Sequence, residues 1–189
     1  MNPALDDIAA FDAVVYDLDG TLVHLAVNWN DVASDVIDVF AEAGVDAADH
    51  DLWGMLELAD EHGLRPEVEA AIADHETTGA RESTRLPLAD TVASVAGRSV
   101  PVGVCSLNCE ASCHVALDVH ELAAHVDSVV GRDSVATYKP DPEPLLAAVR
   151  GLGADAGDVL FIGDSRRDEE TAERAGTAFR YVDGGPSNV

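Results

Sequence analysis

The sequence contains little positive charge. Lysine and arginine together number 11 against 36 aspartates and glutamates, so the formal net charge is −25 and the pI is about 4.2. A protein with an electrostatic field of that sign repels DNA, RNA and anionic lipid. We therefore expect neither nucleic-acid nor membrane partners.

The acidic residues are spread over every segment of the chain rather than gathered in one tail. Carboxylates at this density are typical of proteins from salt-loving microbes, because they stay hydrated in concentrated KCl. Self-repulsion would then destabilise the fold at low salt, and screening would restore it. We expect a halophilic source; the alternative is an acidic protein from an ordinary cytoplasm.

Long hydrophobic runs are also missing. The longest are too short to cross a bilayer, and the stretch MNPALDDIAAFD has neither the basic region nor the apolar segment of a signal peptide. Hydrophobic residues nevertheless make up 47% of the 189 residues, which is enough for a buried core. We expect a cytoplasmic protein with one domain and an insertion.

Aromatic residues and cysteines are few. Aromatic residues make up 5% of the chain, and the three cysteines lie close together at Cys105, Cys109 and Cys113. A metal or redox cluster is one interpretation of this spacing. However, Cys109 and Cys113 are spaced as on one helix face, and Cys105 lies in a strand-like run. We therefore expect buried free thiols.

Five short apolar runs predict β-strands, and helical segments separate the last four of them. Alternation of strands and helices is typical of a parallel sheet with helices on both faces. We therefore expect an α/β, Rossmann-like fold. The predicted strands are residues 12–18, 100–107, 126–131, 158–164 and 178–182, and the predicted helices between them are 109–125, 143–151 and one that ends at Gly176.

The connection between the first and second predicted strands is much longer than an ordinary crossover. Most of it has the periodicity of helices, which are divided by Gly63 and Pro66. We therefore predict a small helical cap over residues 24–85. The cap would be inserted into a core domain formed by residues 1–23 and 86–189.

Two aspartates close the first predicted strand, in the stretch VVYDLDGTLV. Residues i and i+2 of a strand point to the same side, so Asp17 and Asp19 converge while Leu18 packs away from them. Ligands of parallel sheets bind beyond the carboxyl ends of the strands. Two carboxylates there repel each other unless a cation intervenes, and Mg²⁺ prefers such oxygen ligands. Gly20 lets the backbone turn tightly and present N–H groups to a ligand.

Polar residues follow other predicted strands as well. Ser106 offers a hydroxyl to a phosphate, and Lys139, the only lysine, lies before a helix where an anion would need a counter-charge. Asp164 ends the fourth strand, and Asp168 follows four residues later. Taken singly, Asp19 could be a turn residue and Asp168 a helix-start acid. Together these positions predict one site for a metal and a phosphate.

These stretches together resemble the haloacid dehalogenase-like hydrolase superfamily, most of whose members are Mg²⁺-dependent phosphatases. DLDGT resembles its first motif, Ser106 its second, Lys139 its third and GDSRRD its fourth, in the family's order along the chain. The inserted helices resemble the type-I cap of that superfamily. The resemblance implies an enzyme similar to phosphoglycolate phosphatase.

The resemblance also implies roles for individual residues. Asp17 is expected to attack phosphorus and form an aspartyl-phosphate, while Asp19 protonates the leaving oxygen and then activates water. Thr21 and Asn108 are expected to brace the loops, and Mg²⁺ is the expected cofactor. The expected metal ligands are Asp17, Asp19 (through its carbonyl), Asp164 and Asp168, and the expected phosphate-binding residues are Ser106, Lys139, Leu18, Gly20 and Asn108.

Other functions remain open at this point. A phosphomutase resembling β-phosphoglucomutase shares the cap type, but it needs a pocket that retains a bisphosphate. A phospho-acceptor signalling domain is also a parallel sheet with clustered Asp, Ser or Thr and Lys, but it has no large helical insertion. A hydrolase-like fold kept only for binding would have lost a motif residue, and none is lost. Asp19 disfavours a dehalogenase, because displacing halide requires no proton.

The substrate is expected to be a small phosphomonoester such as phosphoglycolate or a sugar phosphate. Residues of the cap normally select the leaving group in such enzymes. The sequence makes no prediction of the oligomeric state. The candidates for selecting the leaving group are His24, Trp29, Trp53, His62, Arg65, Arg81 and Arg85.

Overall fold

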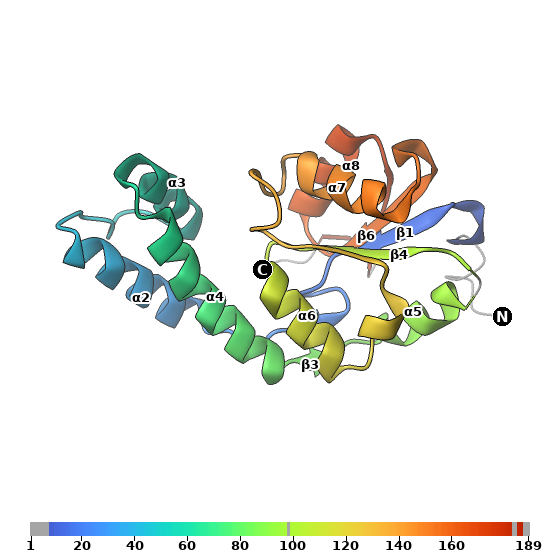
Figure 1. Ribbon diagram of the computed structural model, residues 1–189, viewed down its shortest axis with the longest axis horizontal. Coiled ribbons are helices and arrows are strands. Elements are labelled where there is room, and N and C mark those ends of the chain that lie inside the picture. Colours follow the sequence, from blue (N-terminus) through green and yellow to red (C-terminus); the bar gives the residue numbers. More distant parts are fainter. Residues whose placement is uncertain (1–7, 98, 183–184, 187–189) are drawn as a thin grey trace.

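The computed structural model describes residues 8–97, 99–182 and 185–186. Its centre is a sheet of five parallel strands in the order β5-β4-β1-β6-β7 (Figure 1). The central strand β1 pairs with β4 and β6, so that Val14 is aligned with both Val102 and Leu160. The strands are β1 (Ala13–Tyr16), β4 (Val102–Cys105), β5 (Ser128–Val130), β6 (Val159–Gly163) and β7 (Ala178–Tyr181).

Helices cover both faces of the sheet. In Figure 1, α7 (Glu143–Leu152) and α8 (Arg166–Ala175) lie on one face, and α5 (Ala89–Ala96) and α6 (Glu110–Val119) lie on the other. No helix in the described part of the chain is long and apolar enough to cross a bilayer. Short 3-10 helices are η1 (Ile8–Ala10), η2 (Ala123–His125) and η3 (Ala156–Asp158).

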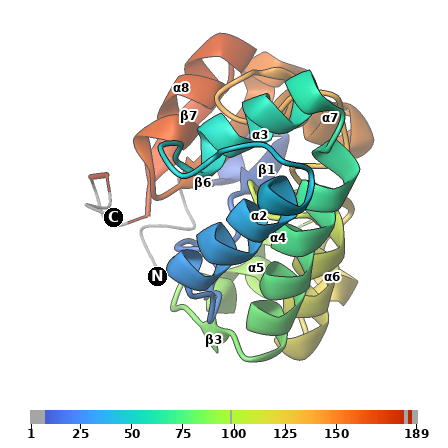
Figure 2. The ribbon, with the colours of Figure 1, turned by 90° about the vertical axis from the view of Figure 1, so that its left-hand side faces the viewer.

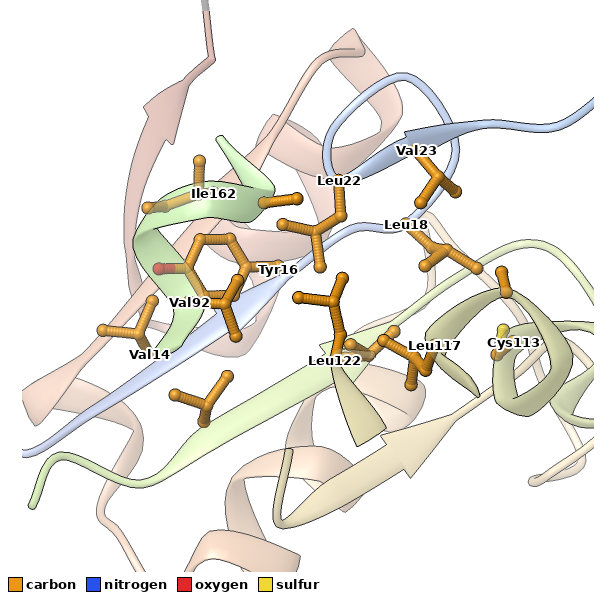
Figure 3. Close-up of a cluster of buried hydrophobic side chains, with 14 of the residues drawn as sticks. Val14, Tyr16, Leu18, Leu22, Val23, Val92, Cys113, Leu117, Leu122 and Ile162 are labelled. Carbon is orange, nitrogen blue, oxygen red and sulfur yellow. The ribbon is translucent and has the colours of Figure 1, made fainter. Parts of the chain in front are cut away.

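Successive side chains of β1 pack against opposite helical layers. Val14 and Tyr16 belong to the cluster on the side of α5 and α6, and Val15 belongs to the cluster beneath α7 and α8. Figure 3 shows the Tyr16 ring among Val92 of α5 and other side chains of the first cluster. Burial on both faces explains why β1 is apolar throughout rather than alternating.

Three further helices lie apart from the sheet, beyond the carboxyl ends of its strands (Figures 1 and 2). They enclose a hydrophobic core of their own, which includes Val32, Val36 and Ile72. The Asp51 side chain caps the second of these helices by accepting from the Gly54 N–H at 2.8 Å. The helices are α2 (Trp29–Glu42), α3 (Leu52–His62) and α4 (Arg65–Arg81).

A two-stranded ladder ties the two ends of this helical segment together. Strands β2 (Val23–His24) and β3 (Thr84–Arg85) are antiparallel. Nearby, the N–H of Ala26 donates to the carbonyl of Gly79 in α4 at 3.1 Å. A Cβ at Gly79 would lie 2.6 Å from the Val27 side chain, so only glycine permits this close crossing. The chain therefore enters and leaves the three helices at one place.

The predicted α/β fold and all five predicted strands are confirmed. The helix predicted over residues 109–125 ends earlier, at Val119, because Glu121 adopts a left-handed backbone with φ of 57°. Helix α5 and the β2–β3 ladder were not predicted. The expected buried free thiols are confirmed: Cys105, Cys109 and Cys113 are all free and buried, and burial raises the pKa of each.

Candidate active site

Acidic side chains converge at the carboxyl ends of β1 and β6. Asp17 follows β1, and its N–H donates to the Ile162 carbonyl of β6 at 2.8 Å. Asp164 follows β6, and Asp168 lies in the first turn of α8. One carboxylate oxygen from each of the three aspartates lies within 4.8 Å of the others. Such a group offers the hard oxygen ligands that divalent cations such as Mg²⁺ prefer.

Lys139 is the positive partner of this carboxylate cluster. Its Nζ donates to Asp17 Oδ1 at 2.8 Å and to Asp168 Oδ1 at 2.5 Å, and the residue is only 1% exposed. Burial lowers the pKa of Lys139, but Asp168 and Asp17 outweigh that effect, so the pKa lies above its usual value. The ammonium group therefore stays protonated at neutral pH.

Asp168 also begins a helix. Its Oδ2 accepts from the N–H of Ser165 at 3.1 Å, while the Ser165 hydroxyl accepts from the Asp168 N–H at 3.3 Å, which together form a capping box. The interpretation of Asp168 as an acidic residue at a helix start is therefore confirmed. The other carboxylate oxygen binds Lys139, so the cap of α8 also fixes the lysine.

Gly20 brings the first turn close to Asp164. It has a φ of 82°, and a Cβ at this position would overlap the Asp164 carboxylate. Its N–H donates to the Val23 carbonyl at 2.8 Å. Leu18 is fully buried in the core on the side of α5 and α6, away from the aspartates, as the strand alternation predicts. The turn is thus specific for glycine.

The Asp17 carboxyl is a weak acid in these surroundings. Burial raises its pKa to about 8, the charge of Lys139 opposes the rise, and Asp168 and Asp164 add to it. An ionised carboxylate at neutral pH therefore needs further positive charge nearby. A divalent cation held by the three aspartates would supply that charge, so the residues present fit a Mg²⁺ ion.

Asp19 lies in a different environment. Its Oδ1 accepts from the Leu25 N–H at 2.8 Å and lies 3.6 Å from His24 Nδ1. Burial raises the pKa of Asp19, and the Leu25 hydrogen bond opposes the rise. A shift of the pKa in this direction favours the protonated form of the carboxyl, which suits a general acid.

The loop after β4 is held from the side of the inserted helices. The Ser106 hydroxyl donates to Asn108 Oδ1 at 3.0 Å, and the N–H of Asn108 donates back to that hydroxyl at 3.1 Å. Asn108 Nδ2 donates to Glu76 Oε1 of α4 at 3.2 Å, and the Cys109 N–H donates to Glu76 Oε2 at 2.9 Å. Glu76 therefore orients this loop.

Arg132 is the charge partner of Glu76. It follows β5, and its Nη1 donates to Glu76 Oε1 at 2.7 Å while Glu76 itself is fully buried. The same guanidinium binds Glu69 at 2.8 Å. Sequence reasoning missed both Glu76 and Arg132. The position of Arg132 directly after a predicted strand could have indicated a site residue. Glu76 is one of 36 acidic residues, and nothing in the sequence distinguishes it from the others.

Many of these groups line a cavity of about 550 Å³ between the sheet and the three inserted helices. Trp53 of α3 lies at this boundary. Its ring stacks on Tyr138 with centroids 5.3 Å apart, and the Arg167 guanidinium lies 4.5 Å from its centroid. The Arg167 side chain therefore packs against an aromatic ring. The predicted site residues that line the cavity are Asp17, Asp19, Asn108, Lys139, Asp164 and Asp168.

Not every candidate residue lies on the cavity wall. Ser106, Leu18 and Gly20 are outside the lining, and Ser106 is buried beneath Asn108. Of the seven residues considered for leaving-group selection, Trp29 and Trp53 line the cavity, and the other five do not. Arg65, for example, pairs with Asp60 and Glu69 instead.

Known proteins are similar to this chain over most of its length. The family model of haloacid dehalogenase-like hydrolase matches residues 14–182. A phosphoglycolate phosphatase of Rhodospirillum rubrum is 34% identical over 184 residues, which cover 87% of this chain and 76% of the relative. A phosphoglycolate phosphatase of Mesorhizobium japonicum is 28% identical, with 91% and 82% covered.

Solved structures have the same architecture. A HAD-superfamily hydrolase of subfamily IA, variant 1, from Geobacter sulfurreducens is 26% identical with a TM-score of 0.62, and the match covers 90% of this chain and 88% of that one. CbbY from Rhodobacter sphaeroides, in complex with phosphate, matches with a TM-score of 0.69 and 18% identity. The match covers 94% of this chain and 87% of that one. At this low identity, the match shows a shared fold and nothing more. The chain therefore belongs to the haloacid dehalogenase-like hydrolase family, and it is an enzyme similar to the phosphatases of that family.

Proposed function

We propose that this protein is a Mg²⁺-dependent phosphatase that hydrolyses a small phosphomonoester through an aspartyl-phosphate on Asp17. The observation that carries the proposal is the buried cluster of Asp17, Lys139 and Asp168 beside Asp164. Lys139 is the only lysine of the chain, and it lies where a phosphoryl group next to Asp17 would need a cation. The names of the relatives from R. rubrum and M. japonicum support a phosphomonoester substrate.

Asp17, Asp164 and Asp168, together with the Asp19 carbonyl, would hold the Mg²⁺. Bound there, the ion would neutralise carboxylate and phosphoryl charge and keep Asp17 ionised. The raised pKa of Asp17 supports this assignment, because the carboxyl would otherwise carry a proton over much of the neutral range. Gly20 would keep Asp164 close by leaving room for its carboxylate.

The chemical steps follow from the positions of the two aspartates. An Asp17 carboxylate oxygen would attack phosphorus, and the bond from phosphorus to the leaving oxygen would break. Asp19 would give its proton to that leaving oxygen. It would then take a proton from the water that attacks the aspartyl-phosphate, which releases phosphate and restores Asp17. The raised pKa of Asp19 supports the first of its two roles.

Lys139, Ser106 and Asn108 would bind the transferring phosphoryl group, with the backbone of Leu18. The Gly20 N–H already donates to the Val23 carbonyl, so Gly20 would contribute by shaping the turn. Transition states of phosphoryl transfer carry charge that positioned donors stabilise. Ser106 would act chiefly by orienting Asn108, to which it is hydrogen-bonded. Residues 24–85 would be the cap and the rest of the chain the core, a division supported by the separate hydrophobic core of the three helices.

Two alternative functions are compatible with the same fold. A mutase similar to β-phosphoglucomutase would retain a bisphosphate intermediate and convert one sugar phosphate into another without net release of phosphate. A binding protein would show no turnover at all. Phosphate release distinguishes the phosphatase from the other two functions, and turnover of a sugar phosphate without phosphate release distinguishes the mutase from the binding protein. The intact set of motif residues favours the phosphatase.

The test is hydrolysis of p-nitrophenyl phosphate in molar KCl, with Mg²⁺ or EDTA. Activity should require Mg²⁺, and Asp17→Asn, which is nearly isosteric, should lower kcat by at least about a thousandfold. Asp118→Asn is the matched control, because Asp118 is exposed on α6 away from the site. Absence of phosphate release from this ester and from a broad panel of phosphometabolites would overturn the proposal.

A further inference from the structure

The wall that the inserted helices contribute to the cavity is mainly apolar. Both tryptophans of the chain lie in this wall, and Trp53 is held in place by Tyr138 and Arg167. A substrate bound with its phosphoryl group at Asp17 would extend its leaving group into the same cavity. The apolar residues of the wall are Trp29, Ala33, Leu52, Trp53, Leu56 and Ile72.

Neither cationic side chain on the described part of the cavity wall is free to bind a second anionic group of the substrate. Among the described residues that line the cavity, the cationic side chains are Lys139 and Arg132. Lys139 is committed to Asp17 and Asp168. Arg132 makes five hydrogen bonds, to Glu69, Glu76 and the Leu107 carbonyl, and these use all five of its N–H groups.

The inserted helices add negative charge to the same space. Asp51 and Glu76 line the cavity from α3 and α4. Glu76 is paired with Arg132, whereas Asp51 is bonded to the N–H of Gly54 at the start of α3. A carboxylate or second phosphate on the substrate would therefore meet apolar rings and an acidic side chain, and it would lose hydration without gaining a partner.

We propose that the natural substrate has an uncharged, largely apolar leaving group, as in an alkyl or aryl phosphate, and that the site selects against a second anion. The inference rests on the proposed phosphatase function and narrows it. It places phosphoglycolate and sugar bisphosphates among the poor substrates. The cavity volume of about 550 Å³ is in the range of pockets for drug-sized ligands and exceeds the needs of a two-carbon leaving group.

The first experiment compares two esters of the same shape. Isobutyl phosphate and phosphoglycolate have leaving groups with the same number of non-hydrogen atoms, and only the second carries a carboxylate. In molar KCl with Mg²⁺, kcat/KM for isobutyl phosphate should be at least tenfold higher. Along a series of longer alkyl phosphates, each buried methylene should raise kcat/KM about fourfold. Equal or faster hydrolysis of phosphoglycolate would overturn the inference while leaving the phosphatase function intact.

A substitution in the wall tests the cause of the selectivity. Trp29 is 43% exposed, so Trp29→Arg is compatible with folding and places a cation at the cavity. Trp29→Arg should raise kcat/KM for phosphoglycolate and lower kcat/KM for isobutyl phosphate. Trp29→Gln should lower kcat/KM for isobutyl phosphate and leave kcat/KM for phosphoglycolate unchanged. Val119→Arg, at an exposed position on α6, changes the net charge by the same amount as Trp29→Arg and should not alter kcat/KM for either ester. Identical effects of both arginine variants would contradict the inference.

Binding can be measured without turnover. Both tryptophans line the cavity, so tryptophan fluorescence of the Asp17→Asn variant reports its occupancy. Isobutyl phosphate should change the fluorescence at concentrations at least tenfold lower than phosphoglycolate. If isobutyl phosphate binds more tightly but the wild type hydrolyses no ester, the phosphatase function is overturned and the inference about the leaving group is not. Tighter binding of phosphoglycolate would overturn the inference about the leaving group.

Discussion

Asp17 is a buried carboxyl, and in the proposed mechanism it must lose its proton before it can attack phosphorus. Its pKa of about 8 reflects burial first and the neighbouring aspartates second, and Lys139 only partly compensates. In the metal-free protein, the fraction of ionised Asp17 therefore rises with pH through about 8. A divalent cation among Asp17, Asp164 and Asp168 favours the ionised form and so lowers this pKa.

This relation predicts that Mg²⁺ shifts the pH profile. At limiting Mg²⁺, kcat/KM should rise with pH through about 8. At saturating Mg²⁺, this rise in kcat/KM should occur at lower pH. The measurement is kcat/KM between pH 5 and 9 at several Mg²⁺ concentrations. Asp164→Asn, which removes one of the proposed ligands, should need more Mg²⁺ for the same shift. If kcat/KM rises at the same pH at all Mg²⁺ concentrations, the result would argue against Asp17 as a metal ligand.

The same raised pKa affects the stability of the metal-free protein. An aspartate has a pKa of about 3.9 in the unfolded chain, so between about pH 4 and 8 the folded state binds a proton at Asp17 that the unfolded state has lost. Asp17 therefore favours the folded state most at low pH, and this contribution declines as pH rises to about 8. In EDTA, urea denaturation should show a steeper decline for the wild type than for Asp17→Asn. Equal slopes would mean that Asp17 ionises normally.

Two elements, the loop after β5 and helix α4, are joined by a buried ion pair. Arg132 and Glu76 are almost completely shielded from water, and Glu76 also holds Asn108. Removing one partner of such a pair leaves the other buried and unpaired, which costs much more than losing an exposed salt bridge. The pair thus fixes how α4 sits on the loop after β4.

Arg132→Met should accordingly lower the free energy of unfolding by about 3–5 kcal/mol, since Glu76 is left as an unpaired buried anion. The double variant with Glu76→Gln removes both charges, keeps an amide oxygen as acceptor for the N–H groups of Asn108 and Cys109, and should recover much of that loss. Glu69 keeps Arg65 as a partner in both variants, so it does not confound the comparison. Chemical denaturation in molar KCl is the measurement. A double variant no more stable than Arg132→Met would show that burial of the unpaired charge is not the cause.

The elements also show what can be predicted from this sequence. Strand ends such as Asp17 and Asp164 were predictable because an apolar run stops abruptly at a polar residue, and parallel strands bring such ends to one edge. Helix α5 and the two-residue strands β2 and β3 are too short for a clear periodicity. The contact between Glu76 and Arg132 spans 56 positions, and nothing local in an acidic helix distinguishes Glu76 from its neighbours.

On the scale of the whole molecule, the net charge of −25 dominates. Exposed acidic side chains lie on each of the helices α2, α3 and α8, and the repulsion among such charges falls as salt screens it. We predict that the melting temperature rises by more than about 5 °C between 0.1 and 2 M KCl, which corresponds to roughly 2 kcal/mol for a chain of this size. Calorimetry with sucrose in place of KCl is the control, because sucrose does not screen charge. A melting temperature independent of KCl would contradict the expected halophilic behaviour.

The ladder between Val23–His24 and Thr84–Arg85 makes the helical segment a detachable module. Because the chain departs and returns across one pair of hydrogen-bonded strands, another segment that supplies a partner for Arg132 could replace it without changing the path of the chain through the sheet. Helical segments of other lengths and compositions could be joined at these same two points. Evolution of a new substrate range would then require exchange of one continuous piece of the gene, while Asp17, Lys139 and Asp164 stay where the sheet holds them.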